Sequence, residues 1–130
     1  FFHMPPAEFK EAYEKMKLGD HSVIYEHGSI GEKDEYFGIS NRPPHFFEKA
    51  VDNGWLKWIF CGHDHLNTLS LTYKGIRMTY GMSIDYLGYS GIAKQYIQRG
   101  ATLITRKTNG NIDITMVPLT TVVSTRVRGA

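Results

Sequence analysis

The chain has 130 residues, of which 42% are hydrophobic, 13% aromatic and 22% charged; this is the size and balance of one folded domain and excludes a disordered chain. The formal net charge of +2 is too small to indicate binding to nucleic acid or to an anionic membrane, and the sequence has no run of 18 apolar residues that would span a bilayer. A single cysteine, Cys61, excludes an internal disulfide and leaves the cellular compartment open.

The first residues, FFHMPP, have the character of the end of a buried strand followed by a proline break. The sequence therefore predicts that residues 1–130 are one truncated, C-terminal portion of a longer domain. Apolar residues then recur at helical spacing over residues 7–17, with an acidic first turn and a basic last turn, which predicts an amphipathic helix. The stretch from Asp20 to Arg42 is rich in glycine and charge and predicts a long, irregular lid.

A second helix is predicted over residues 44–53, opened by two prolines and closed by Asn53-Gly54. The apolar run WLKWIFCG that follows is typical of a strand buried on both faces. Alternating residues predict a hairpin over 68–80 and another over 101–117, in one sheet, with turns at Lys74-Gly75 and Asn109-Gly110. A glycine-rich connection with a helical turn near residues 92–98 joins them. The fold class is α/β, with a mixed sheet and antiparallel hairpins at the C-terminal end.

Histidines gather where the predicted strands end. His63 and His65 follow Gly62 at the end of the apolar run, and His3 follows Phe1 and Phe2 in the same way. On extended backbone, side chains two residues apart point to the same face. Ligands of open α/β sheets bind beyond the carboxyl ends of strands, and neutral imidazole is the commonest metal ligand. The sequence therefore predicts that these three histidines converge on a metal site.

These motifs carry a resemblance. FFHMPP followed about sixty residues later by CGHDH resembles the C-terminal half of the calcineurin-like metallophosphoesterases, in the branch close to purple acid phosphatases. The resemblance implies half of a four-layer α/β/β/α sandwich with two divalent or trivalent ions, such as Fe, Mn or Zn, in the intact protein. It implies that His3 and His63 bind one ion and His65 the other. The implied reaction is hydrolysis of a phosphomonoester or phosphodiester.

The N-terminal motifs of that family, which supply the bridging aspartate, do not occur in this sequence. Two ions roughly 3.5–4 Å apart need carboxylates to offset their repulsion, and three neutral imidazoles do not supply this. We therefore expect a partial site, no catalytic residue in this chain, little activity of the isolated chain, and self-association through an exposed apolar sheet. The alternative is a non-enzymatic metal-binding or interaction module that keeps the fold.

Other residues were assigned from their local setting. Asn67 and His27 are candidate substrate-binding residues, although a turn residue is the more common role of an asparagine in such a position. His27, Tyr36 and Arg42 would contact substrate if the lid closes over the metals; the more common alternative is that they lie on a solvated loop. Strand alternation directs Asp64 to solvent or to a loop backbone. Cys61 is expected to pack in the core, and His45, at the start of a helix, is expected to be structural or on the surface.

Overall fold

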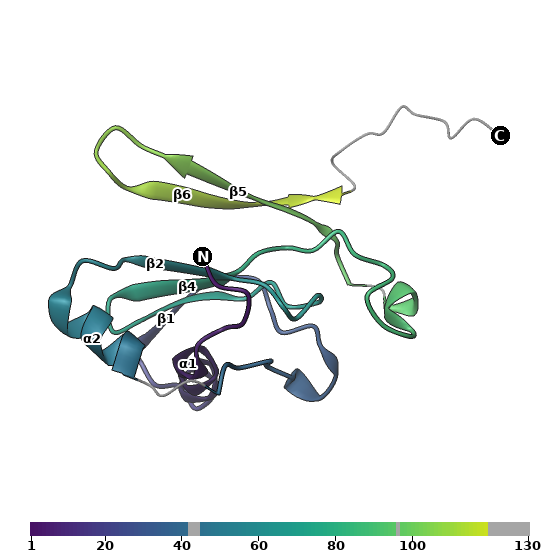
Figure 1. The fold of residues 1–130 in the computed structure, drawn as a ribbon, viewed down its shortest axis with the longest axis horizontal. Coiled ribbons are helices and arrows are strands. Elements are labelled where there is room, and N and C mark those ends of the chain that lie inside the picture. The colour runs from purple at the N-terminus through teal and green to yellow at the C-terminus, as the bar shows by residue number, and fades with distance from the viewer. Residues whose placement is uncertain (42–44, 96, 120–130) are drawn as a thin grey trace. The chain divides into compact units, whose positions relative to one another are not determined.

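The computed structural model describes residues 1–41, 45–95 and 97–119, which fall into two compact units, Phe1–Gly81 and Met82–Ala130 (Figure 1). The first unit is built on a mixed four-stranded sheet in the order β1-β3-β4-β2. Its strands are β1 (Val23–His27), β2 (Trp58–Cys61), β3 (Ser70–Tyr73) and β4 (Ile76–Tyr80). β3 runs antiparallel to both of its neighbours, β1 and β4, and β2 runs parallel to β4. The prediction of an α/β fold with a mixed sheet is confirmed.

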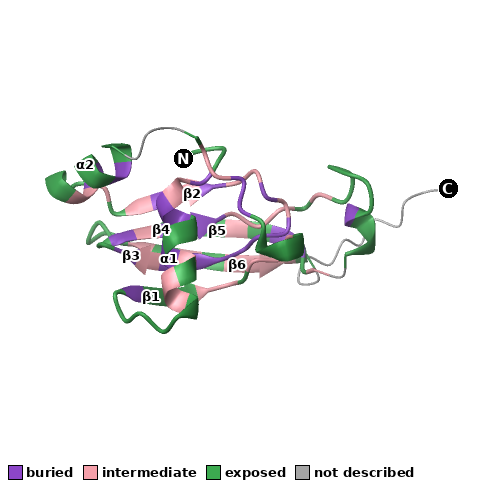
Figure 2. Cartoon of the chain, turned by 90° about the horizontal axis from the view of Figure 1, so that it is seen from below, coloured by how far each residue is buried: buried purple, intermediate pink, exposed green. Residues whose placement is uncertain are grey.

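Two helices, α1 (Ala7–Lys17) and α2 (His45–Asn53), lie on one face of this sheet (Figure 1). Phe9 of α1 and Phe47 of α2 are fully buried in a core that the inward-facing residues of β3 and β4 complete. In Figure 2 much of the buried chain of the first unit lies along the strands of the sheet. Both predicted helices are confirmed in the described residues; residues 43 and 44, where the second was expected to open, lie outside them.

The predicted lid, Asp20 to Arg42, contains a strand that we did not expect. β1 occupies its first part and pairs with β3, and a short 3-10 helix, η1 (Lys33–Glu35), follows. Only Val23 of β1 is buried, so the strand has no alternating apolar pattern to reveal it. Pairing with β3, which lies far along the chain, makes it a strand.

β2 is buried on one face, which corrects the prediction of burial on both. Ile59 is 1% exposed and Cys61 is buried, whereas Trp58 and Phe60 between them are half-buried. Trp55, before the strand, is 67% exposed. β2 forms an edge of the sheet, so an apolar sequence in this position covers one core face only.

The second unit contains a two-stranded antiparallel sheet of β5 (Gly100–Arg106) and β6 (Ile112–Pro118). Lys107 and Asp113 form an ion pair of 2.8 Å near its turn, and Gly110 supplies the positive φ of 86° that the turn requires. Both predicted hairpins exist, but they belong to separate sheets, so the expectation of one sheet is wrong. The helical turn predicted near residues 92–98 is a 3-10 helix, η2 (Ile92–Lys94).

In the part of the chain that the structure describes, there is no helix with the length and hydrophobicity to cross a membrane.

Candidate functional site

His3 and His63 meet because the first residues of the chain run alongside the end of β2. Phe2 pairs with Cys61 in parallel, and its N–H donates to the Phe60 carbonyl over 2.8 Å. The Gly62 N–H then donates to the carbonyl of His3 over 3.1 Å. His3 Nε2 and His63 Nδ1 consequently lie 3.3 Å apart.

The nitrogen pair suits either a hydrogen bond between the rings or a shared metal ion. Two imidazole nitrogens bound at about 2.0–2.1 Å to one tetrahedral ion lie roughly 3.3–3.4 Å from each other. The observed separation of 3.3 Å between His3 Nε2 and His63 Nδ1 agrees with this nitrogen–nitrogen distance. The two residues therefore fit as two ligands of a single ion.

A third ligand beside this pair is not found: among the described residues, no group of three or more His, Cys, Asp or Glu side chains is arranged to hold a metal ion. The backbone of His63 has a φ of +71°, so the chain has left the strand conformation at this residue. The alternation that was expected to point His63 and His65 in the same direction therefore does not apply here.

Asp64, which lies between His63 and His65 in the sequence, is buried. It bonds to a loop backbone, which is one of the two positions expected for it. Its Oδ2 accepts a hydrogen bond from the Gly38 N–H over 2.9 Å and another from the Tyr80 hydroxyl over 2.5 Å. Burial and the adjacent carboxylate raise the pKa of Tyr80 well above its usual range, so this hydroxyl remains a donor.

Asn67 is fully buried, and its amide is engaged with the segment from Gly28 to Gly38, here called the anchored loop. Asn67 Oδ1 accepts from the backbone N–H groups of Gly31 and Glu32 over 3.0 and 3.1 Å, and its Nδ2 donates to the Tyr36 carbonyl over 3.0 Å. Asn67 thus acts on the protein backbone in this structure. The predicted lid is hydrogen-bonded to the loop that carries the histidines.

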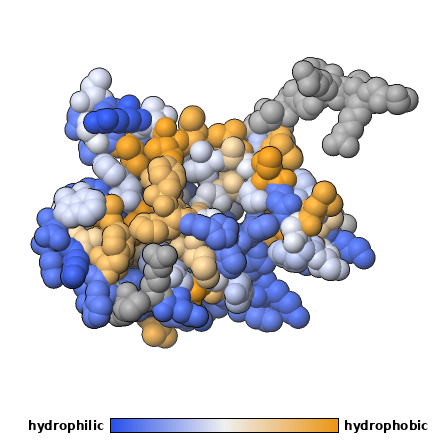
Figure 3. Space-filling model, in the orientation of Figure 1, coloured by the Kyte–Doolittle hydropathy of each residue, from blue (hydrophilic) through white to orange (hydrophobic). Residues whose placement is uncertain are grey.

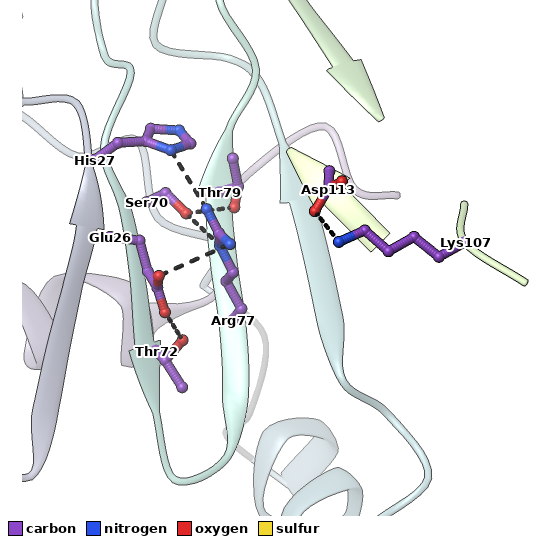
Figure 4. Close-up of polar contacts among 8 residues, drawn as sticks. All are labelled: Glu26, His27, Ser70, Thr72, Arg77, Thr79, Lys107 and Asp113. Carbon is purple, nitrogen blue, oxygen red and sulfur yellow. Dashed lines mark hydrogen bonds and ion pairs between the residues drawn. The ribbon is translucent and has the colours of Figure 1, made fainter. Parts of the chain in front are cut away.

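His27 lies on the sheet face opposite the helices, among six residues called here the polar face: Glu26, His27, Ser70, Thr72, Arg77 and Thr79 (Figure 4). A register shift between Tyr25 and His27 lets two consecutive residues reach Arg77. Glu26 Oε2 is 3.8 Å from one guanidinium nitrogen, and His27 Nδ1 is 3.3 Å from another.

The environment of His27 favours its neutral form. Burial lowers its pKa, and the positive charge of Arg77 lowers it further. Because Nδ1 faces an Arg77 donor, the proton of the neutral ring is on Nε2, and among the described residues this buried atom has no hydrogen-bond partner. The contacts of His27 are therefore with the polar face, through Arg77.

The remaining candidates are placed as follows. Cys61 is buried, as predicted, and burial raises the pKa of its thiol above the usual range. His45 is exposed and lies 3.9 Å from Glu48 on α2. Tyr36 is exposed, and Arg42 lies outside the described residues. Gly38 and Tyr80, which contact Asp64, carried no signal in the sequence, because their roles depend on residues distant along the chain.

The fold and the histidine pair can now be compared with known proteins. The chain is similar to a protein of Arabidopsis thaliana named probable inactive purple acid phosphatase 14, with 38% identity over 47 residues. Those residues are 36% of this chain and 12% of the relative, so the similarity hints at the purple acid phosphatase family over a small part of its length. No family model matches the chain, and no solved structure matches it.

Proposed function

We propose that this chain is the C-terminal part of a metal-dependent phosphoesterase related to purple acid phosphatases, and that the intact protein hydrolyses a phosphomonoester or phosphodiester. The observation that carries the proposal is the 3.3 Å separation between His3 Nε2 and His63 Nδ1, which fits two ligands of one ion. The partial similarity to a purple acid phosphatase relative supports the same reading.

In this proposal His3 and His63 hold one ion of a two-metal centre, and His65 contributes to the second. Such ions, for example Fe, Mn or Zn, supply Lewis acidity toward the phosphoryl group. Neutral imidazoles offer no negative charge to balance two cations, so the isolated chain holds at most one loosely bound ion. We expect the chain alone to hydrolyse phosphate esters poorly or not at all.

A second candidate function is a non-enzymatic metal-binding or interaction module. One observation favours it: the relative from Arabidopsis thaliana is itself named probable inactive. In this case the fold and the histidine pair are retained without hydrolysis.

Metal binding is tested first, on the chain as it stands. Zinc or manganese is titrated in competition with a chromophoric chelator. We expect one weak site that is lost in His3→Ala and in His63→Ala, and retained in His45→Ala, which removes an exposed histidine on α2. Equal binding by all four proteins would refute the assignment of this pair.

Hydrolysis is tested on p-nitrophenyl phosphate and bis-p-nitrophenyl phosphate, with the chain compared to a longer form from the same gene that supplies the carboxylates. The proposal expects turnover by the longer form, at least 100-fold less in the short chain, and loss on replacing His63 and His65 by alanine. No turnover by a longer form that binds metal would favour the non-enzymatic module. Turnover that survives the double replacement would contradict the site.

A further inference from the structure

The imidazole of His63 rests directly against the backbone of Gly38. A Cβ atom added at Gly38 would lie 1.9 Å from His63 Cδ2 and 2.5 Å from His63 Nε2, far inside any contact distance. Gly38 is not among the glycines with positive φ, so the backbone conformation does not require a glycine here. A glycine is required because the His63 ring occupies the space that a Cβ would need.

Asp64 holds that piece of backbone in place. The Gly38 N–H and the Tyr80 hydroxyl both donate to Asp64 Oδ2, over 2.9 and 2.5 Å, so one carboxyl oxygen joins the loop backbone to β4. Tyr80 is itself fixed, because its ring stacks on that of Phe9 with a centroid separation of 5.0 Å. The support of the His63 ring is thus connected to the hydrophobic core.

The conformation of His63 shows why such support is needed. Its φ of +71° lies in the left-handed region, which is unfavourable for a residue with a Cβ and persists only where the surroundings enforce it. With the ring against Gly38, its Nδ1 is directed toward His3 Nε2 at 3.3 Å. A ring free to turn would not hold this nitrogen in place.

We infer that Asp64, Gly38 and Tyr80 form a clamp that positions the His63 imidazole with Nδ1 toward His3. They are positioning residues, since they act on His63 and not on a substrate. The use of the clamp in metal binding rests on the function proposed above. Because coupling between two events is reciprocal, an ion held by His63 should in turn slow hydrogen exchange at the Gly38 N–H.

A purely structural role for the same residues predicts something different. If Asp64 and Gly38 only attach the anchored loop, their replacement lowers stability and leaves the ring of His63 as it was. The decisive readout is therefore the His63 ring itself in the metal-free chain, followed through its imidazole ¹⁵N chemical shifts and its χ1 coupling constants.

The variants are Gly38→Ala, which places a methyl group against the ring, and Asp64→Asn, which keeps an acceptor and removes the charge. Tyr80→Phe removes one donor and keeps the core aromatic. Gly81→Ala is the matched control, since a Cβ there meets its nearest neighbour, the Cys61 carbonyl oxygen, at 3.8 Å, which is ordinary contact. Urea unfolding of each variant establishes that it is folded.

We expect Gly38→Ala, Asp64→Asn and Tyr80→Phe to shift the imidazole ¹⁵N signals of His63. Their χ1 coupling constants should show a side chain that averages over several rotamers. Gly81→Ala should retain the wild-type values. Zinc affinity should fall about tenfold or more in Gly38→Ala and Asp64→Asn. Altered ring signals in a chain that binds no zinc at His63 would support the clamp and count against the proposed function. Unchanged ring signals in folded Asp64→Asn and Gly38→Ala would overturn the clamp.

Discussion

Asn67 joins two distant stretches of the chain through one buried amide. Replacing it with alanine removes the acceptor for two backbone N–H groups and the donor to the Tyr36 carbonyl. Because buried polar groups without partners are costly, Asn67→Ala should lower the free energy of unfolding by about 2–4 kcal/mol. Urea denaturation measures it.

The control for this prediction is Asn53→Ala. Asn53 is exposed and makes one side-chain bond, to the Lys49 carbonyl within α2, so the change should stay within about 0.5 kcal/mol. If Asn67→Ala lowered the free energy of unfolding by no more than Asn53→Ala does, the anchored loop would not depend on the Asn67 amide.

His27 makes stability depend on pH. Burial and Arg77 lower its pKa in the folded chain from an ordinary value of 6.5, so the unfolded chain binds the proton more readily. The stabilisation is therefore fully present above about pH 6.5 and is lost as the pH falls below it. Urea midpoints measured between pH 5 and 8 should fall toward acid, and the fall should be smaller in His27→Gln. His21→Gln, at an exposed position, should keep the wild-type slope; an equal change in both variants would contradict the prediction.

Among the structural elements, the connection between β4 and β5 depends on one arginine. The guanidinium of Arg99 is buried and donates to the carbonyls of Asp85, Ile92 and Ile97 over 2.6–2.9 Å. Lysine lacks this planar set of donors, so Arg99→Lys should cost about 2–4 kcal/mol. It should also increase hydrogen exchange of the amides at residues 87 and 88.

Arg106→Lys is the matched control for this prediction. Arg106 lies in β5 of the same unit and is exposed, so its replacement should leave exchange in the connection unchanged. Protection that is unaltered in Arg99→Lys would show that the three carbonyl contacts do not order this segment.

At the level of the whole molecule, an apolar patch surrounds the N-terminus: Phe1, Phe2, Met4 and Phe46. All four are exposed, Phe1 by 92%, and the rings of Phe2 and Phe46 lie 5.3 Å apart. Figure 3 shows hydrophobic side chains on this side of the molecule. The patch lies beside the end of β2, where Phe2 pairs with Cys61, and exposed apolar patches promote association. We expect the chain to self-associate at micromolar concentration.

Light scattering coupled to gel filtration tests this expectation. Phe46→Ser and Phe2→Ser should shift the chain toward the monomer. Leu87→Ser is the control, because Leu87 is 90% exposed but belongs to the second unit and is not one of the four patch residues. A chain that is monomeric throughout, or one that responds equally to Leu87→Ser, would contradict self-association through this surface.

The sequence alone determined the elements whose signals are local. Helical spacing and end charges in residues 7–17, and the turns at Lys74-Gly75 and Asn109-Gly110, depend on neighbours a few residues away, and these elements formed as predicted. The close approach of His3 and His63 was also foreseeable, since both follow apolar strand ends. That they bind metal remains a prediction.

The tertiary structure decided what depends on distant partners. β1 is a strand because β3 is available to pair with it, and β2 is buried on one face because the core of the first unit lies on that face only. Asp64 and Asn67 turn inward because backbone donors of the anchored loop meet them there, and His63 leaves the strand conformation at the same point. Hydrogen bonds between residues 26 to 36 positions apart have no local signature, because nothing in the spacing of either segment records the partner that will satisfy it.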